Sequence, residues 1–395
     1  MSNLILNQSI YDFKPNDIKY IHHNENYCVY KINYDNLDYD FKISVISNID
    51  LEINKIKEKY KIKDEYLNCF KSFVETEDLI FNKFKDLEYK NNLVEYYGIN
   101  KNCLIIENEE YKEINKQIKE TYGMEIEENN NKLLFTLSSS ENKNKENNNY
   151  SILYFKHYEH KNVYQIYQEI DKIKDKKERL NELLKFISDI LIQLFIQVFY
   201  IYKKYPNFIF FNLFEIIIHL DQKNILKLNN KTYEFVYELK LNNFETSSII
   251  DDDYNKSIIN SDIIYESEKK NYFNMMFNKN GEYEINKDMI KKIQKKDFEE
   301  LILTFLCNYL LDYKDEYETI KKYFINRKLN FMVDLFDALI NSSIINEKYN
   351  INLNVVEASN LYYTYLFYNV SILIYDKLFD IQRVFKDLDL IYIYI

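Results

Sequence analysis

The sequence predicts an α+β fold in which a small β-rich lobe is followed by a larger, mainly helical lobe. Residues 18–46 alternate apolar and polar side chains in short runs that Asn and Asp separate, which is typical of antiparallel strands. Residues 178–204 and the chain from 287 to about 385 instead repeat apolar side chains at helical spacing. With 395 residues, of which 46% are hydrophobic, the chain has enough apolar surface for one large domain or two modest ones.

The first lobe is expected to contain strands, one helix and further strands. Residues 18–46 predict three strands of an antiparallel meander. Apolar residues recur at helical spacing from 64 to 87, and the segments 91–99 and 103–107 return to the strand pattern. Residues 108–149 are acidic and rich in Asn, and this composition buries too little surface to offset the entropy of ordering. They therefore predict a mostly solvated insertion.

The second lobe is expected to be organised around one long helix, whose most apolar part is 186–202. In that part Asp189, Gln193 and Gln197 follow one another at spacings of four, which favours a buried amphipathic helix over a membrane span. The expected segments are, in order, a strand at 151–158, helices at 161–173 and 178–204, two or three strands between 208 and 242, a polar stretch at 245–287 and helices to about 385.

Charge and cysteine content argue against several classes of protein. The net charge is −11 and no block is uniformly basic, so a nucleic-acid partner is not expected. The four cysteines lie far apart without a CxxC pair, and the five histidines show no ligand spacing, so neither a disulfide framework nor a zinc site is indicated. The N-terminus lacks the basic start and apolar core of a signal peptide, which favours a cytoplasmic protein. Three Gly, two Pro and 39 Tyr suit an AT-rich genome, such as that of a large DNA virus, whose product would lie in the host cytoplasm or in the virion.

Lys42 and Glu77 belong to a pattern of strand and helix that a known family shares. Lys42 lies in the third expected strand, downstream of Val29 in the second, and Glu77 lies in the helix that follows. In this order the chain resembles the protein kinase superfamily, in which a lysine of the third strand pairs with a glutamate of the first-lobe helix. The resemblance implies a two-lobed protein-kinase-like fold, with Lys42 and Glu77 paired at a vestigial nucleotide site. Taken alone, a lysine in a strand is more often a solvated side chain.

The second lobe resembles the same family in shape more than in chemistry. The long helix and the segment after it align without a gap to the family's helix, catalytic loop and following strand. In that register Asn212 takes the place of the catalytic Asp, and Ile217 that of a metal-binding Asn. Asn243, Phe244 and Glu245 occupy the places of the Asp-Phe-Gly motif, so the metal-binding carboxylate is missing. An amide supplies no charge for Mg²⁺, a hard cation that prefers carboxylate oxygen.

Two further matches concern a structural pair and the phosphate-binding loop. Asp297 and Leu301 stand where the family's central second-lobe helix carries a structural Asp and a packing Leu. His22, Asn24 and Tyr27 stand at the three glycine positions of the loop that covers the ATP phosphates, where Tyr27 would intrude. Because phosphoryl transfer relies on positioning and on metal ions, these losses imply a pseudokinase without catalytic residues or a metal site.

A rival register of the catalytic loop stays open. His219, Asp221 and Asn224 can be aligned with the family's catalytic-loop His, Asp and Asn, which would restore ATP and Mg²⁺ chemistry. This register requires a deletion in a loop whose spacing sets the geometry of the base and the metal ligand. Otherwise His219 is a histidine satisfied within a strand or turn.

The function expected from the resemblance is binding and regulation. The kinase-like first lobe would span 15–160 including the insertion, the second lobe 161–385, and a tail 386–395. The chain would be a scaffold, decoy or regulator that engages a true kinase or a kinase substrate, with no cofactor and with neither nucleic acid nor membrane as partner. One alternative is a divergent active Ser/Thr kinase that uses ATP and Mg²⁺ through the rival register. Another is a structural or virion-associated protein, which predicts no pair between Lys42 and Glu77.

Overall fold

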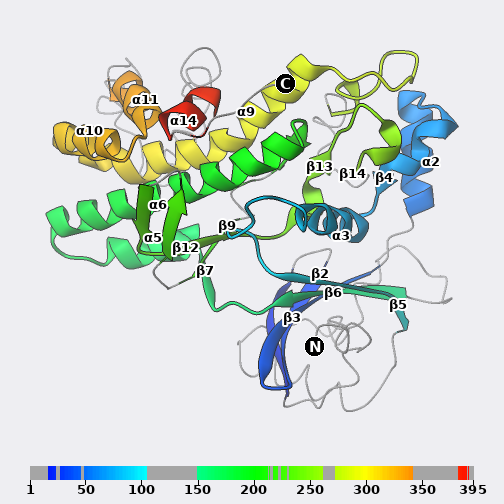
Figure 1. Ribbon diagram of the computed structural model, residues 1–395, viewed down its shortest axis with the longest axis horizontal. Helices are drawn as coiled ribbons and strands as arrows, with labels where there is room; N and C mark the ends of the chain where they lie inside the picture. Colours follow the sequence, from blue (N-terminus) through cyan, green and yellow to red (C-terminus); the bar gives the residue numbers. More distant parts are fainter. Residues whose placement is uncertain are drawn as a thin grey trace, which may run out of the picture.

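The chain is described by a computed structural model, in which a small antiparallel sheet stands beside a larger group of helices (Figure 1). It is a mixed α/β protein. Nearly all of the predicted insertion lies outside the described residues. The structure describes residues 17–23, 27–45, 49–104, 149–211, 213, 217–220, 224–228, 231–260, 272–340, 381–388 and 390.

The small sheet has five antiparallel strands in the order β1-β2-β3-β6-β5. The three strands predicted for 18–46 are confirmed. A two-residue loop joins β2 to β3, and its residues Asp35 and Asn36 have φ values of 54° and 61°. Asp and Asn tolerate this left-handed conformation, which matches the twist of a hairpin. The strands are β1 (Ile18–His23), β2 (Tyr27–Tyr34), β3 (Leu37–Val45), β5 (Tyr96–Leu104) and β6 (Asn149–Lys156).

Helix α3 (Phe73–Phe84) lies between the sheet and the helical group (Figure 1). Ser72 caps its start, because its side chain accepts the Glu75 amide hydrogen while the Glu75 side chain accepts that of Ser72. The prediction of one helix over 64–87 was therefore wrong in its first part. The 3₁₀ helix η3 (Asp64–Cys69) and the short strand β4 (Phe70–Lys71) precede the cap, and helix α2 (Ile49–Tyr60) has no counterpart in the prediction.

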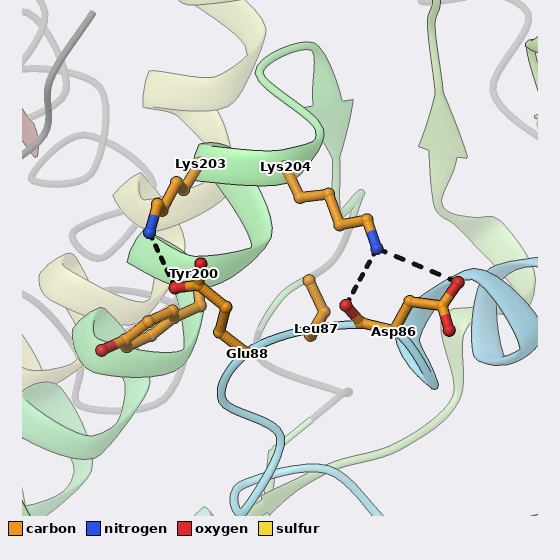
Figure 2. A pocket seen from close by; sticks show the side chains of 6 residues that line it. All are labelled: Asp86, Leu87, Glu88, Tyr200, Lys203 and Lys204. Atoms are coloured by element: carbon orange, nitrogen blue, oxygen red, sulfur yellow. Dashed lines mark hydrogen bonds and ion pairs between the residues drawn. The ribbon is translucent and has the colours of Figure 1, made fainter.

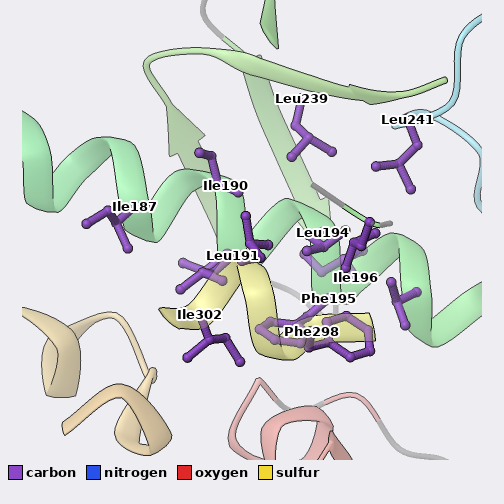
Figure 3. Packing of buried hydrophobic residues seen from close by; sticks show 14 of the residues in the cluster. Ile187, Ile190, Leu191, Leu194, Phe195, Ile196, Leu239, Leu241, Phe298 and Ile302 are labelled. Carbon is purple, nitrogen blue, oxygen red and sulfur yellow. The ribbon is translucent and has the colours of Figure 1, made fainter. Parts of the chain in front are cut away.

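The long helix α6 (Lys176–Lys204) is the centre of the main hydrophobic cluster. Figure 3 shows it between Leu239 and Leu241 on one side and Phe298 on the other. By length and composition α6 could cross a membrane, but 89% of its most apolar window is buried inside the protein, as in a core helix. Further helical elements among the described residues are α5 (Val163–Asp171), the short 3₁₀ helices η5 (Phe244–Thr246) and η6 (Tyr254–Lys256), α9 (Lys287–Leu303), the π-helical η7 (Thr304–Leu310), the 3₁₀ helix η8 (Leu311–Glu316), α10 (Tyr317–Asn326), α11 (Asn330–Ile340) and α14 (Ile381–Asp387).

The polar stripe of α6 is buried and bonded to the backbone of neighbouring segments. Asp189, Gln193 and Gln197 are at most 4% exposed. The Gln193 side chain accepts the Leu239 amide hydrogen at 3.1 Å and donates to the Tyr237 carbonyl at 2.9 Å. The stripe therefore satisfies buried backbone groups, as burial of polar side chains requires.

Short strands connect the two parts of the molecule. The described residues between 208 and 241 form five of them, where two or three were predicted, because a β-hairpin, β10-β11, interrupts the sequence between β9 and β12. Three-stranded pairing joins β12, β9 and β7, while β13 pairs with β8 and β14 with β4. The strands are β7 (His160–Asn162), β8 (Phe208–Ile209), β9 (Ile217–Leu220), β10 (Asn224–Leu228), β11 (Lys231–Phe235), β12 (Glu238–Leu241), β13 (Ser248–Ile249) and β14 (Ile259–Asn260).

A second hydrophobic cluster lies where the sequence predicts only a polar stretch. It joins Ile56 of α2 and Phe70 of β4 to Tyr272, Phe273 and other side chains from the segment 272–277. The polar interpretation of 245–287 was wrong for this segment. At the C-terminal end, α14 continues to Asp387 and the buried side chains of Leu388 and Leu390 belong to the main cluster, so packing does not stop at 385.

Candidate functional site around Lys42

Lys42 lies on the central strand β3, between β2 and β6, and is only 3% exposed. Its Nζ donates to Glu77 Oε2 at 2.6 Å and to Glu245 Oε2 at 2.5 Å. A third acceptor, Asn243 Oδ1, lies 3.3 Å away. An ammonium group has three N–H donors, so these three oxygens use all of them. The structure thus brings together Lys42, Glu77 and the two outer residues of the triplet 243–245.

Three separate elements hold these side chains. Glu77 comes from the buried face of α3, whereas Asn243 and Glu245 come directly after β12. Asn243 has a φ of 57°, a left-handed conformation that Asn adopts more readily than most residues. This turn directs Phe244 into the core and leaves Glu245 beside Lys42.

Phe244 fixes the position of α3 relative to the triplet. It is fully buried, and its ring meets those of Phe81 and Phe84 edge to face, with centroids 5.2 Å apart in both cases. It also packs against Phe208 and Phe210. Such aromatic contacts add to the free energy gained by burial. Phe244 therefore couples the helix that carries Glu77 to the segment that carries Glu245.

Tyr27 covers a further side of Lys42. Its ring centroid is 3.9 Å from Lys42 Nζ, and the residue is 5% exposed. A cation over an aromatic face is attracted by the ring quadrupole, the more so where water is excluded. Tyr27, which the resemblance to protein kinases would place at a glycine position of a phosphate-binding loop, lies directly against the lysine.

The buried cluster of Lys42, Glu77 and Glu245 holds one positive and two negative groups. The two carboxylates raise the pKa of Lys42 well above its usual range, although burial alone would lower it. Burial and the neighbouring Glu245 carboxylate raise the pKa of Glu77 to about 7, against the opposing influence of Lys42. The second carboxylate therefore makes ionisation of the first more costly.

The raised pKa of Glu77 predicts a pH-dependent stability. The folded state binds the proton of the Glu77 carboxyl group more tightly than the unfolded state does. The contribution of this proton to the free energy of unfolding is therefore complete below about pH 4.5 and is lost as the pH rises through about 7. Relative to Glu77→Gln, wild-type protein should lose on the order of 1–3 kcal/mol of unfolding free energy between pH 5 and pH 8. Urea unfolding of both proteins at the two pH values measures the difference, and parallel pH profiles would contradict the assignment.

Asp297 of α9 holds the backbone that leads to position 212. Its Oδ2 accepts the Phe210 amide hydrogen at 2.8 Å, and its Oδ1 that of Phe211 at 3.1 Å. Phe211 has a φ of 45°, which is strained for a bulky residue, so these two charge-assisted bonds stabilise an unusual conformation. Leu301, one turn further along α9, is fully buried in the main cluster.

The remaining residues predicted for the site are placed only in part. His22 belongs to β1, Ile217 and His219 belong to β9, and Asn224 begins β10. Strand β9 pairs with β12 and β7, so His219 has a strand backbone. Positions 24, 212 and 221 lie outside the described residues. The structure therefore does not bring the rival set of 219, 221 and 224 together as a described site.

Glu245 is the partner of Lys42 that sequence reasoning missed. The sequence places it at the glycine position of the triplet, but no role follows from that alignment. The available signal was a carboxylate at a position where the family pattern has no side chain. Such a group, adjacent to a buried lysine, is a natural counter-ion.

A surface cavity of about 250 Å³ lies away from the Lys42 cluster, between the end of α6 and the loop after α3 (Figure 2). Lys203 bonds Glu88 at 2.7 Å, and Lys204 bonds the Asp86 carbonyl at 2.9 Å. Both lysines that line the cavity thus already have partners. The cavity is lined by Asp86, Leu87, Glu88, Tyr200, Lys203 and Lys204.

Within the described ranges, no group of three or more His, Cys, Asp and Glu side chains could hold a metal ion.

No protein-family model matches the chain, and no curated protein matches it.

Proposed function

We propose that the chain is a protein-kinase-like protein without efficient phosphoryl transfer, which acts as a scaffold, decoy or regulator of a kinase or its substrate. The observation that carries the proposal is the buried 2.6 Å contact between Lys42 of β3 and Glu77 of α3. The structural-protein alternative predicts no such pair, so the contact counts against it. In the proposed fold, the small sheet with helix α3 beside it would be the first lobe and the larger helical part the second (Figure 1).

The chemistry around Lys42 supports binding without catalysis. Asn243 offers an amide oxygen where Mg²⁺ would need a carboxylate. Phosphoryl transfer depends on metal ions that neutralise developing charge and on a lysine that pairs with the helix glutamate and also reaches the phosphates. Here a second carboxylate, Glu245, also bonds the lysine, and Tyr27 covers it. The kinase-like shape would therefore serve a protein partner.

A phosphoryl-transfer assay tests the proposal. Purified protein is incubated with γ-labelled ATP and Mg²⁺ alone and with a mixture of Ser, Thr and Tyr peptides, and incorporation is measured. We expect none above that of a Lys42→Met variant. The active-kinase alternative instead predicts Mg²⁺-dependent incorporation that Asp221→Asn abolishes, because a catalytic-loop Asp receives the proton of the substrate hydroxyl. That result would overturn the proposal.

A further inference from the structure

Glu245 is held against Lys42 by a rigid segment. The Thr246 hydroxyl donates to the Phe211 carbonyl at 3.0 Å, and the Ser247 hydroxyl donates to the Phe210 carbonyl at 2.8 Å. The side-chain amide of the buried Asn260 donates to the Glu245 carbonyl. The chain at Glu245 and directly after it is thus fixed, and its carboxylate is a built part of the site.

Neutralisation of Lys42 does not require Glu245. Glu77 is fully buried and already contacts the ammonium group at 2.6 Å, so one positive and one negative charge are matched without the second carboxylate. A second buried carboxylate adds desolvation cost and repulsion between like charges, which raises the pKa of Glu77. A neutral acceptor at 245 would leave the pair intact. The presence of a carboxylate at position 245 is therefore not explained by the stability of the folded state.

We propose that Glu245 is an internal anion that occupies Lys42 and excludes phosphate-bearing ligands from it. The inference rests on the proposed function, in which Lys42 marks a vestigial nucleotide site. Lys42 has no N–H group left for a phosphate oxygen, because Glu77, Glu245 and Asn243 accept from it. An incoming phosphate must displace the carboxylate of Glu245 and meets its negative charge. The carboxylate of Glu245 thus closes the site from within, beside the ring of Tyr27.

Removal of this carboxylate should open the site. Inorganic pyrophosphate is titrated into each protein in the presence of EDTA, and binding is measured by calorimetry. Metal-free ATP is the probe in a second series. Glu245→Ala removes both charge and volume, whereas Glu245→Gln removes the charge and keeps an acceptor. We expect an affinity for pyrophosphate at least about tenfold higher in Glu245→Ala than in wild type, with Glu245→Gln between them. The gain should vanish when Lys42→Met is added.

Glu282→Ala is the matched control, because Glu282 also pairs with a lysine, Lys63, at 2.8 Å but on the surface. It should bind pyrophosphate as wild type does. A folded Glu245→Ala variant that binds pyrophosphate no more tightly than wild type would overturn the proposal. If neither Glu245→Ala nor Glu245→Gln folds, the carboxylate of Glu245 is needed for folding, and the proposal is overturned as well. Because no metal or transfer is involved, these outcomes are independent of the phosphoryl-transfer assay.

Discussion

Replacement of Lys42 by methionine is expected to lower the unfolding free energy by about 3–5 kcal/mol at neutral pH. The substitution keeps the length of the side chain but leaves the carboxylates of Glu77 and Glu245 buried without a cation. They must then take up protons or draw in water. The loss should shrink toward pH 5, where protonation is less costly, and urea unfolding at both pH values measures it.

Lys31→Met is the control for this experiment. Lys31 lies one strand away and pairs with Asp38 at 2.8 Å and with Glu159 at 3.1 Å, but both partners are accessible to solvent. Ion pairs of this kind contribute about 0–1 kcal/mol. Equal losses for the two variants would mean that the buried cluster around Lys42 is no more important than a surface pair.

Phe244→Ala should cost about 3–5 kcal/mol, the usual range for removal of a fully buried phenylalanine. The cavity would lie beside α3 and β8, because the ring contacts Phe81 and Phe84 of the helix and Phe208 of the strand. Beyond the global loss, hydrogen exchange should accelerate in α3, since its main contact with the triplet is gone.

Phe244→Leu provides the graded comparison. Leucine fills part of the cavity without the edge-to-face contacts, so its loss should be clearly smaller than that of alanine. The exposed Tyr164, changed to alanine, should have little effect on stability. Unchanged exchange of α3 amides in a folded Phe244→Ala protein would contradict the coupling between the helix and the triplet.

The sequence predicted those elements whose structure depends on residues close together in the chain. The alternation of 18–46 predicted three strands, and the Asp35–Asn36 loop suits the hairpin between two of them. The boundary of α3 was missed because helical periodicity continued through 64–87 and outweighed the capping pair of Ser72 and Glu75.

Long-range packing explains what the sequence did not predict. The residues Tyr272 to Phe277 sit in a polar stretch, and their burial depends on α2 and β4, which are distant in the chain. The contact between Lys42 and Glu77 was expected from the resemblance, because the sequence places Lys42 in a strand and Glu77 in the helix that follows. The addition of Glu245 required the left-handed turn at Asn243, which only the folded backbone reveals.

Thermal-shift titration with ATP, with and without Mg²⁺, measures whether the site around Lys42 binds a nucleotide with its metal ion. A ligand that binds only the folded state raises the melting temperature by mass action. We expect no Mg²⁺-dependent shift, because Asn243 supplies no charge for the metal and Glu245 occupies Lys42. A rise in melting temperature that requires both ATP and Mg²⁺ would contradict this expectation and favour a catalytic kinase.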